Sequence, residues 1–179
     1  WLYVIIGLTF LSGVLGTGHH YYYIGVNKIW LVVGGIFSAL EPLAFLAMAL
    51  FAVNMYRKGE KSHPNKIALF WTIGSAIVSF IGAGLLGFAH TLPQTNLYTH
   101  GTLVTAMHGH YAFWGAYAMI VLAIISYALP NLTGRKRYNS VQGNAAFWLS
   151  NIGILGMTVA FVVAGVAVHP FTGAALDAV

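Results

Sequence analysis

The stretch Thr102–Leu129, TLVTAMHGHYAFWGAYAMIVLAIISYAL, contains no lysine, arginine, aspartate or glutamate. About 20 mainly apolar residues are enough for a helix to cross the hydrocarbon core of a bilayer. The stretch therefore predicts a transmembrane helix, and its two histidines lie inside the apolar part of that helix.

Four further segments are long and apolar enough to span a bilayer. The five expected spans are 1–17, 29–56, 66–89, 102–129 and 144–168. Of the 179 residues, 59% are hydrophobic and 6% are charged, whereas a soluble domain is usually about one-quarter charged. Disordered chains are polar and highly charged, so they are excluded too. We expect an all-α, polytopic transmembrane helix bundle surrounded by the lipid bilayer, and a piece of a longer polypeptide.

The charged residues and cysteines limit the chemistry. The net charge is +5, but no basic face interleaved with aromatic residues is present, so nucleic acid is not an expected partner. The sequence has no cysteine, which excludes disulfides and thiolate metal sites. Any metal must therefore be held by histidine or carboxylate. Eight histidines outnumber the three acidic residues.

Basic residues concentrate in two connections and predict the orientation. These residues are Arg57, Lys58, Lys61 and Lys66 in one connection and Arg135, Lys136 and Arg137 in the other. The positive-inside rule places both connections in the cytoplasm. The connections that carry His19 and His20, and that lead to His100, then face outward.

His108 and His110 are separated only by Gly109 on the fourth expected span. Residues two apart on a helix point about 200° apart, so the two imidazoles can ligate two centres on opposite sides but not one shared metal. Haem iron takes axial imidazole, and Gly109 removes a side chain where two flat macrocycles would crowd the backbone. The spacing favours a helix between two haems. The alternative is two buried histidines that hydrogen-bond to neighbouring helices.

His19 and His20 are adjacent in the segment GTGHHYYY, which begins at Gly16. Neutral imidazole suits iron, copper and zinc, so the pair predicts a non-haem metal site with further ligands from elsewhere. We expect Gly16 and Gly18 to supply backbone angles that turn both rings toward one ion. The alternative is a solvated turn at the membrane surface.

Glu41 is the only acidic residue inside an expected span, and Pro42 follows it. An unpaired ionised carboxylate is costly in lipid, so Glu41 is expected to be neutral, paired or in a wet cavity, at a depth similar to that of His108. Pro42 should bend the span. The functional interpretation is a proton carrier or an acid near a metal; the alternative is a structural acid.

The remaining histidines give weaker signals. His100 precedes His108 by eight residues, so on one helix it would reach the rim of a group held by His108 or act as an interfacial cap. His90 is expected to have a structural role at the outer end of its span. His63 receives no function.

Five segments in this order resemble the catalytic subunit of bacterial nitric oxide reductase, a branch of the haem-copper oxidase superfamily. They are 16–22 (GTGHHYY), 38–42 (SALEP), 63–66 (HPNK), 98–102 (YTHGT) and 108–110 (HGH). The resemblance covers nearly the whole chain and is closer to the cytochrome c-dependent form than to the quinol-dependent form. It implies about five spans, the seventh to the eleventh, of a twelve-span fold.

The resemblance implies a role for each candidate residue. His19 and His20 would bind the non-haem iron FeB, His108 would be the proximal ligand of haem b3, and His110 an axial ligand of haem b. Glu41 would be a catalytic acid that delivers protons. The remaining FeB ligands and the second ligand of haem b belong to earlier spans of the family, so this fragment alone is not expected to be active.

The implied reaction reduces two NO to N2O and water, with electrons relayed through haem b. A membrane-anchored cytochrome c subunit is the expected donor. The expected location is the bacterial inner membrane, with His19 and His20 toward the periplasm.

Three alternatives remain open. An oxygen-reducing haem-copper oxidase would carry copper in place of FeB, and imidazole alone does not choose between these metals. A non-catalytic membrane cytochrome b would explain His108 and His110 but leave the other candidates unused. A non-haem channel or transporter would show no haem spectrum.

Overall fold

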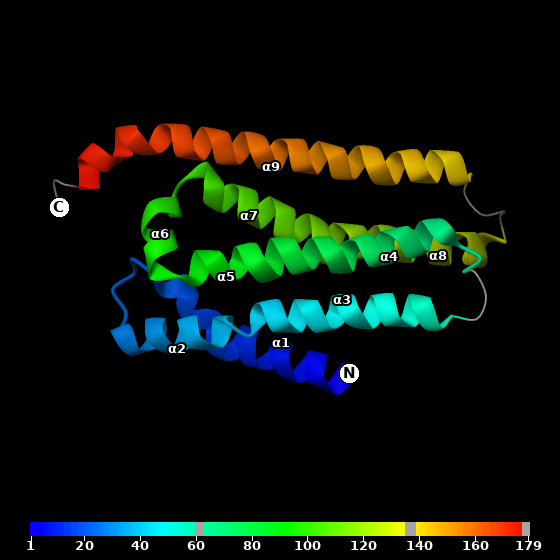
Figure 1. Cartoon of the computed structure of the whole chain (residues 1–179), viewed down its shortest axis with the longest axis horizontal. Helices are drawn as coiled ribbons and strands as arrows, with labels where there is room; N and C mark the ends of the chain where they lie inside the picture. Colours follow the sequence, from blue (N-terminus) through cyan, green and yellow to red (C-terminus); the bar gives the residue numbers. More distant parts are fainter. Residues whose placement is uncertain (60–62, 135–138, 177–179) are drawn as a thin grey trace.

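The computed structural model describes residues 1–59, 63–134 and 139–176, with side chains described up to residue 167. Within these ranges the chain forms helices and no strand (Figure 1). The elements follow in the order α1 (Leu2–Gly16), the 3₁₀ turn η1 (Thr17–Tyr21), α2 (Lys28–Ser38), α3 (Glu41–Lys58), α4 (Lys66–Ser79), the π-helical segment η2 (Phe80–Leu85), α5 (Leu86–Thr91), α6 (Pro93–Thr99), α7 (Leu103–Phe113), the π-helical segment η3 (Trp114–Ala118), α8 (Met119–Thr133) and α9 (Ser140–Leu176). The all-α expectation is confirmed.

In the described part of the chain, five helices are long and apolar enough to cross a membrane. Their bounds are Leu2–Tyr21, Lys28–Lys58, Lys66–Thr91, Leu103–Thr133 and Ser140–Ala167. The expected spans 1–17, 29–56, 66–89, 102–129 and 144–168 overlap these helices one for one, so each expected span corresponds to one helix. Their exact limits in a bilayer stay a prediction.

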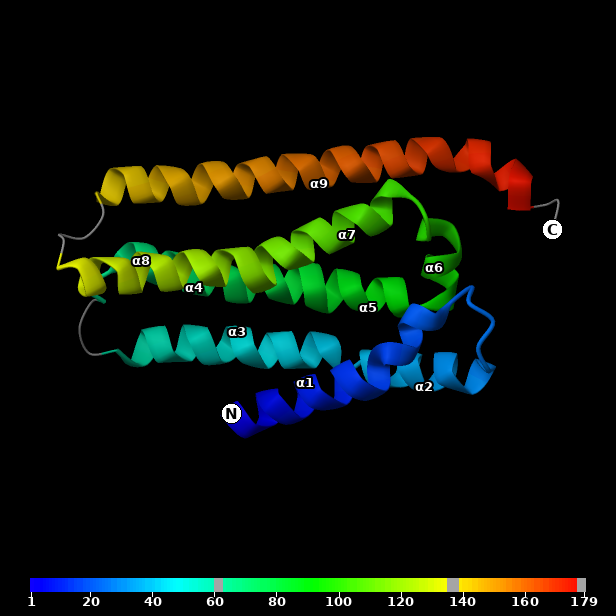
Figure 2. The ribbon, with the colours of Figure 1, turned by 180° about the vertical axis from the view of Figure 1, so that it is seen from behind.

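The helices form a layered bundle. The α4–η2–α5 and α7–η3–α8 spans lie side by side at its centre, α9 covers one side, and α2, α3 and α1 cover the other (Figures 1 and 2). The buried centre contains Ile67, Trp71, Met119 and Ala123, with Phe147 of α9 packed against them. The Trp71 ring meets the Phe147 ring edge-on at 5.0 Å between centroids. Aromatic packing therefore joins three of the spans.

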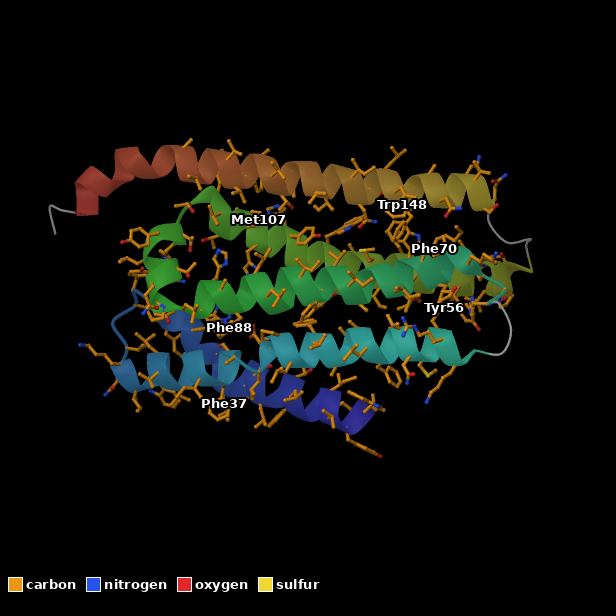
Figure 3. All side chains as sticks on the ribbon, viewed as in Figure 1. Phe37, Tyr56, Phe70, Phe88, Met107 and Trp148 are labelled. Carbon is orange, nitrogen blue, oxygen red and sulfur yellow. The ribbon has the colours of Figure 1, made fainter. Side chains whose placement is uncertain are left out.

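The outward faces are apolar, as expected for helices whose solvent is lipid. Trp148 on α9 is 59% exposed and projects from the bundle (Figure 3). Leu149, Ile152 and Val163 on the same helix are also exposed. This surface would be unfavourable in water and is suited to a bilayer.

The second expected span is not one helix bent at Pro42, as the sequence suggested, but two helices. The α-helix α2 ends at Ser38, and α3 begins at Glu41 after the turn at Ala39 and Leu40. Proline fits the first turn of a helix because its missing N–H would have no partner there. Pro42 therefore starts α3 and places Glu41 at its N-terminal end.

The third and fourth spans are also interrupted, by η2 and η3, although the sequence predicted uninterrupted helices. Their backbones approach closely at two glycines. A Cβ on Gly82 would lie 2.9 Å from Cδ1 of Tyr111, and a Cβ on Gly115 would lie 2.7 Å from the backbone nitrogen of Ser79. π-Helical turns free backbone groups from the regular ladder, often at functional sites.

Candidate functional site

A cavity of about 440 Å³ lies between η1, α3, α5, α6 and α7. Its polar lining includes His19, His20, Tyr22, Glu41, His90, Asn96, His100 and His108. Four of the five candidate residues, from three expected spans, are therefore brought together. The fifth, His110, lies on another face of α7 and lines a separate groove.

The turn η1 holds His19 by lying directly against α2. A Cβ on Gly18 would overlap the carbonyl oxygen of Trp30, and a Cβ on Gly34 would overlap the backbone nitrogen of His19. No side chain fits at either position. The expectation that the glycines supply unusual backbone angles is wrong, because Gly16 has φ −71° and Gly18 does not have a positive φ. The glycines provide close approach instead.

Ser38 fixes the orientation of the His19 ring. Its buried Oγ lies 2.6 Å from the carbonyl oxygen of Gly34, to which it donates its single proton. The Nδ1 atom of His19 lies 2.5 Å from the same Oγ and must therefore donate to it. The lone pair of His19 is left on Nε2, as in histidines that bind a metal.

His20 lies beside His19, with the two ring centroids 4.1 Å apart and the planes tilted by 41°. Two adjacent imidazoles suit iron or copper. In residues 1–59, 63–134 and 139–176, no group of three or more His, Cys, Asp or Glu side chains is arranged to hold a metal ion. A complete centre would thus need ligands in addition to this pair.

Glu41 and His108 face each other across Gly87. A Cβ on Gly87 would lie 3.5 Å from Oε2 of Glu41 and 3.3 Å from Cε1 of His108. The carboxyl group and the imidazole are therefore at similar depth, as the helix arithmetic indicated. Both line the same cavity.

The π-helical segment η2 orients His108. Its Nδ1 lies 3.0 Å from the carbonyl oxygen of Gly82, and since a carbonyl only accepts, Nδ1 carries the proton. Nε2 is the nitrogen left with a lone pair. A metal-binding histidine usually has such a partner on its other nitrogen.

His110 faces an apolar groove of about 600 Å³ along α7, η3 and α8. The groove is lined by Phe113, Trp114, Tyr117, Ala118, Val121, Leu122 and Ile154. Nδ1 of His110 donates to the carbonyl oxygen of Ala106 at 2.7 Å, which leaves Nε2 with the lone pair. The imidazole ring meets Phe161 of α9 edge-on, with centroids 5.5 Å apart. The arrangement suits a flat apolar group held by one imidazole.

Residues 1–177 match the family described as cytochrome c and quinol oxidase polypeptide I. The chain belongs to this oxidase family. Together with the five apolar helices, this membership makes the chain part of a multi-pass membrane protein.

The resemblance seen in the sequence is confirmed by a relative within this family. The chain is 50% identical over 170 residues to the catalytic subunit of the nitric oxide reductase of Stutzerimonas stutzeri. The alignment covers 93% of this chain and 36% of the relative, so the chain spans about a third of that protein's length.

Membership of the oxidase family implies haem and iron as cofactors. The residues fit these groups, because His108 and His110 present Nε2 atoms on different sides of one helix. His110 lies on an apolar groove wide enough for a macrocycle edge, whereas His108 lies with His19 and His20 in a polar cavity.

His100 is not on the same helix as His108, as the sequence suggested. The helix α6 ends at Thr99, Gly101 has φ +72°, and the hydroxyl of Thr102 caps α7 by accepting from the nitrogen of Val104. The glycine and the cap stop one helix and start another. The His100 ring still lines the cavity, with its centroid 4.4 Å from that of Tyr23.

Three residues of the site were not predicted from the sequence: Ser38, His90 and Tyr22. The Tyr22 hydroxyl donates to the carbonyl oxygen of Thr91 at 2.7 Å and joins η1 to the end of α5. Burial raises the pKa of Tyr22 above its usual value of 10, so the hydroxyl keeps the proton that it donates. The only sequence signal was the position of each residue next to a candidate, since packing across spans is not visible in one sequence.

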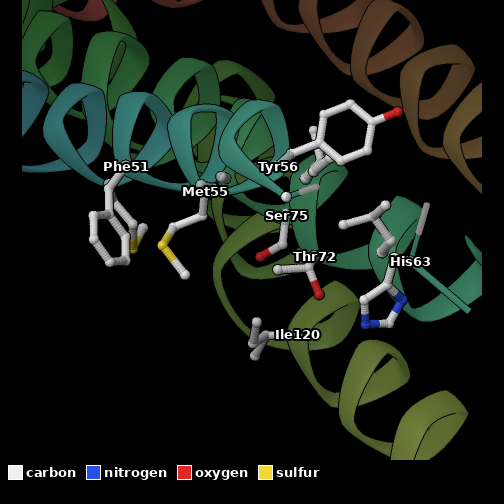
Figure 4. Close-up of a pocket in the computed structure, with 13 residues that line it drawn as sticks. Phe51, Met55, Tyr56, His63, Thr72, Ser75 and Ile120 are labelled. Carbon is white, nitrogen blue, oxygen red and sulfur yellow. The ribbon is translucent and has the colours of Figure 1, made fainter. Parts of the chain in front are cut away.

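A second cavity lies at the other end of the bundle, where α3 ends and α4 begins. Its volume is about 470 Å³ (Figure 4). The lining is largely apolar, with Phe51, Met55 and Ile120, and includes the hydroxyls of Thr72 and Ser75. It contains no candidate residue apart from His63, to which the sequence assigned no function.

Proposed function

We propose that this chain is the part of a membrane nitric oxide reductase that carries the reaction site, in an enzyme that converts two NO, two electrons and two protons into N2O and water. The observation that carries the proposal is the division of two histidines between two sites on α7. His108 shares a cavity with His19, His20 and Glu41, while His110 lies on the apolar groove. The relative from the nitric oxide reductase of Stutzerimonas stutzeri supports it.

The residues divide the work by position. His108 would hold haem b3 through Nε2, His110 would hold haem b, and His19 with His20 would hold the non-haem iron FeB. When bound, these irons would bind NO and supply the electrons that reduce it. The chain keeps the two haem-binding positions two residues apart, so a single helix separates the sites.

Glu41 would carry protons to the site. The reaction consumes two protons, and the Glu41 carboxyl group borders the cavity beside Gly87. The cavity opens toward the end of the bundle that carries η1 and α6, which the basic connections place outside. Protons would enter from the periplasmic side, and dependence of turnover on cytoplasmic pH alone in oriented vesicles would contradict this route.

The full enzyme would lie in the bacterial inner membrane, with a membrane-anchored cytochrome c subunit as electron donor. Lys58 and Lys66, at the ends of α3 and α4, support a cytoplasmic position for that end of the bundle. The expected cytoplasmic residues Lys61, Arg135, Lys136 and Arg137 lie outside the described residues.

The test uses the full-length enzyme, with and without the substitution His20→Ala. Iron and copper content and the reduced optical spectrum would be measured for both proteins. We expect two b-type haems and one further iron, with only the further iron lost in the variant. His63→Ala, at the opposite end of the bundle, is the matched control and should keep all three.

Two results would contradict the proposal. Copper in place of the third iron would indicate an oxygen-reducing oxidase. A protein without any haem would return His108 and His110 to structural roles, as in a channel or transporter.

A further inference from the structure

The helix α5 contacts the His108 ring at two positions one turn apart. At the ring edge, a Cβ on Gly87 would lie 3.3 Å from Cε1 and 3.9 Å from Nε2. On the ring face, the His90 imidazole is stacked, with centroids 4.9 Å apart and planes within 19° of parallel. The fit between α5 and this imidazole therefore includes both edge and face.

The His90 ring is itself firmly held. Its Nδ1 donates to the carbonyl oxygen of Leu86 at 2.8 Å, and the side-chain nitrogen of Asn96 donates to the His90 carbonyl oxygen at 2.9 Å. These contacts fix the ring and the backbone that carries it. His90 is thus a fixed surface for the His108 ring to pack against.

Hydrogen bonding at the other ring nitrogen does not explain why His90 is here. Among the described residues, its Nε2 is buried and has no hydrogen-bond partner. A buried polar atom without a partner costs about 1–3 kcal/mol and calls for an explanation in a native structure. The stacked face against His108 is the contact that remains to supply one.

A partner on the ring face leaves the ligating nitrogen accessible. The lone pair of an imidazole lies in the ring plane, so a macrocycle bound to Nε2 meets the ring at its edge and not at its face. The hydrogen bond to Gly82 fixes one atom of His108, and a stacked ring additionally fixes the plane. Together they define the direction in which Nε2 points.

We propose that His90 is a positioning residue whose ring face sets the plane of the His108 imidazole, and with it the orientation of the axial ligand of the high-spin haem. The inference rests on the proposed function, since it requires a haem on His108. It assigns to His90 a role beyond capping the end of a span.

The test compares three full-length proteins: the unaltered enzyme, His90→Phe and His90→Ala. Phenylalanine keeps a flat ring but lacks both nitrogens, whereas alanine removes the ring. The measurement is the low-frequency Raman band of the bond between the reduced high-spin haem iron and its imidazole, at haem contents read from the optical spectrum. His63→Ala serves as the control.

We expect one narrow band at the same frequency in the unaltered enzyme, the control and His90→Phe. In His90→Ala we expect the band to shift and broaden, or the high-spin haem to be lost. An unchanged band in His90→Ala would overturn the inference. So would equal changes or equal haem loss in both variants, because the nitrogens or the fold would then matter instead of the ring. An unaltered enzyme without this band would contradict the proposed function itself.

Discussion

At the scale of single residues, the candidate histidines share one arrangement. In His19, His108 and His110 the Nδ1 atom donates a hydrogen bond, to Ser38, Gly82 and Ala106 respectively. Each bond selects the tautomer that leaves the lone pair on Nε2. The protein thereby prepares each imidazole to bind a metal, using backbone carbonyls and one hydroxyl.

Ser38→Ala tests this arrangement at the histidine pair. The change removes the acceptor of the His19 proton, so the ring loses its fixed orientation. We expect the full-length enzyme to lose most of its non-haem iron while both haems remain, as measured by metal content and optical spectrum. Loss of the group that hydrogen-bonds to a metal ligand typically lowers metal affinity about 10- to 100-fold.

Ser12→Ala is the matched control for Ser38. The Ser12 side chain is also buried, but it donates only to the carbonyl oxygen of Thr9 within its own helix. Equal iron loss in both variants would show that Ser38 acts through general stability and not through His19.

Gly87→Ala tests the contact between Glu41 and His108. The added methyl group would lie 3.3 Å from the His108 ring and 3.5 Å from the Glu41 carboxyl group, so one of them must move. We expect an altered spectrum of the high-spin haem and lower turnover. Gly35→Ala, whose Cβ would have no neighbour within 4 Å, should behave as the unaltered enzyme. An unaltered haem spectrum in Gly87→Ala would refute the contact.

At the scale of elements, η2 and η3 contact each other's spans reciprocally. The Gly82 carbonyl of η2 accepts from His108 on the fourth span, and the Gly115 carbonyl of η3 accepts from the Ser75 hydroxyl on the third span at 2.6 Å. Each segment thus offers a backbone carbonyl to a side chain of the other span. The two interruptions stabilise the crossing that positions His108.

A second link joins the same two spans at their other end. Pro130 has no N–H, so the carbonyl of Ser126 four residues earlier lacks its helical partner. The side-chain nitrogen of Asn65 donates to this carbonyl at 2.8 Å, while the side-chain oxygen of Asn65 caps α4 by accepting from the Ala68 nitrogen. One asparagine therefore completes the backbone of two helices.

Substitutions at Asn65 separate these two functions. Serine still caps a helix but is too short to reach Ser126, so Asn65→Ser should cost about 1–3 kcal/mol by leaving a buried carbonyl unpaired. Asn65→Ala also removes the cap and should cost about 1 kcal/mol more. Denaturant unfolding of the full-length enzyme in detergent would measure both costs. Asn131→Ala, at an exposed site, is the control; equal stability of all variants would exclude the link.

The sequence predicted the spans well but not their interruptions. Apolar length alone identifies a membrane helix, because lipid requires every backbone group to be bonded within the span. The break at Ser38–Glu41 and the segments η2 and η3 depend instead on contacts with neighbouring spans. No residue type announces them.

The same division applies to the candidate site. The spacing of His108 and His110, and the pattern around His19 and Glu41, were readable in one dimension and by resemblance. Ser38 and His90 were not, because their partners lie 19 and 18 residues away on other helices. Only the packing of η1 and α5 reveals them.

At the scale of the whole molecule, the two ends of the bundle differ in character. The end with η1 and α6 carries the cavity lined by histidines, and the end where α3 meets α4 carries the apolar cavity and two lysines, Lys58 and Lys66. This polarity supports an orientation in which the histidine cavity faces the periplasm.

Single cysteines would test this orientation, since the sequence has none of its own. Gln94 on α6 and Lys58 on α3 are both exposed. We expect Gln94→Cys to react with a membrane-impermeant maleimide added to intact spheroplasts, and Lys58→Cys to react only after lysis. A permeant maleimide is the control for both, and the reverse pattern would place the cavity in the cytoplasm.

The segment η3 also makes the chain sensitive to length. An α-helix turns about 100° per residue, and a π-helical turn holds one additional residue. Deletion of one residue from Trp114–Ala118 would leave His108 and His110 in place but rotate α8 by about 100°, turning the Ser126 carbonyl away from Asn65. The number of residues between the histidines and Pro130 is therefore under constraint whatever their identity, and insertions or deletions there should be tolerated far less than substitutions.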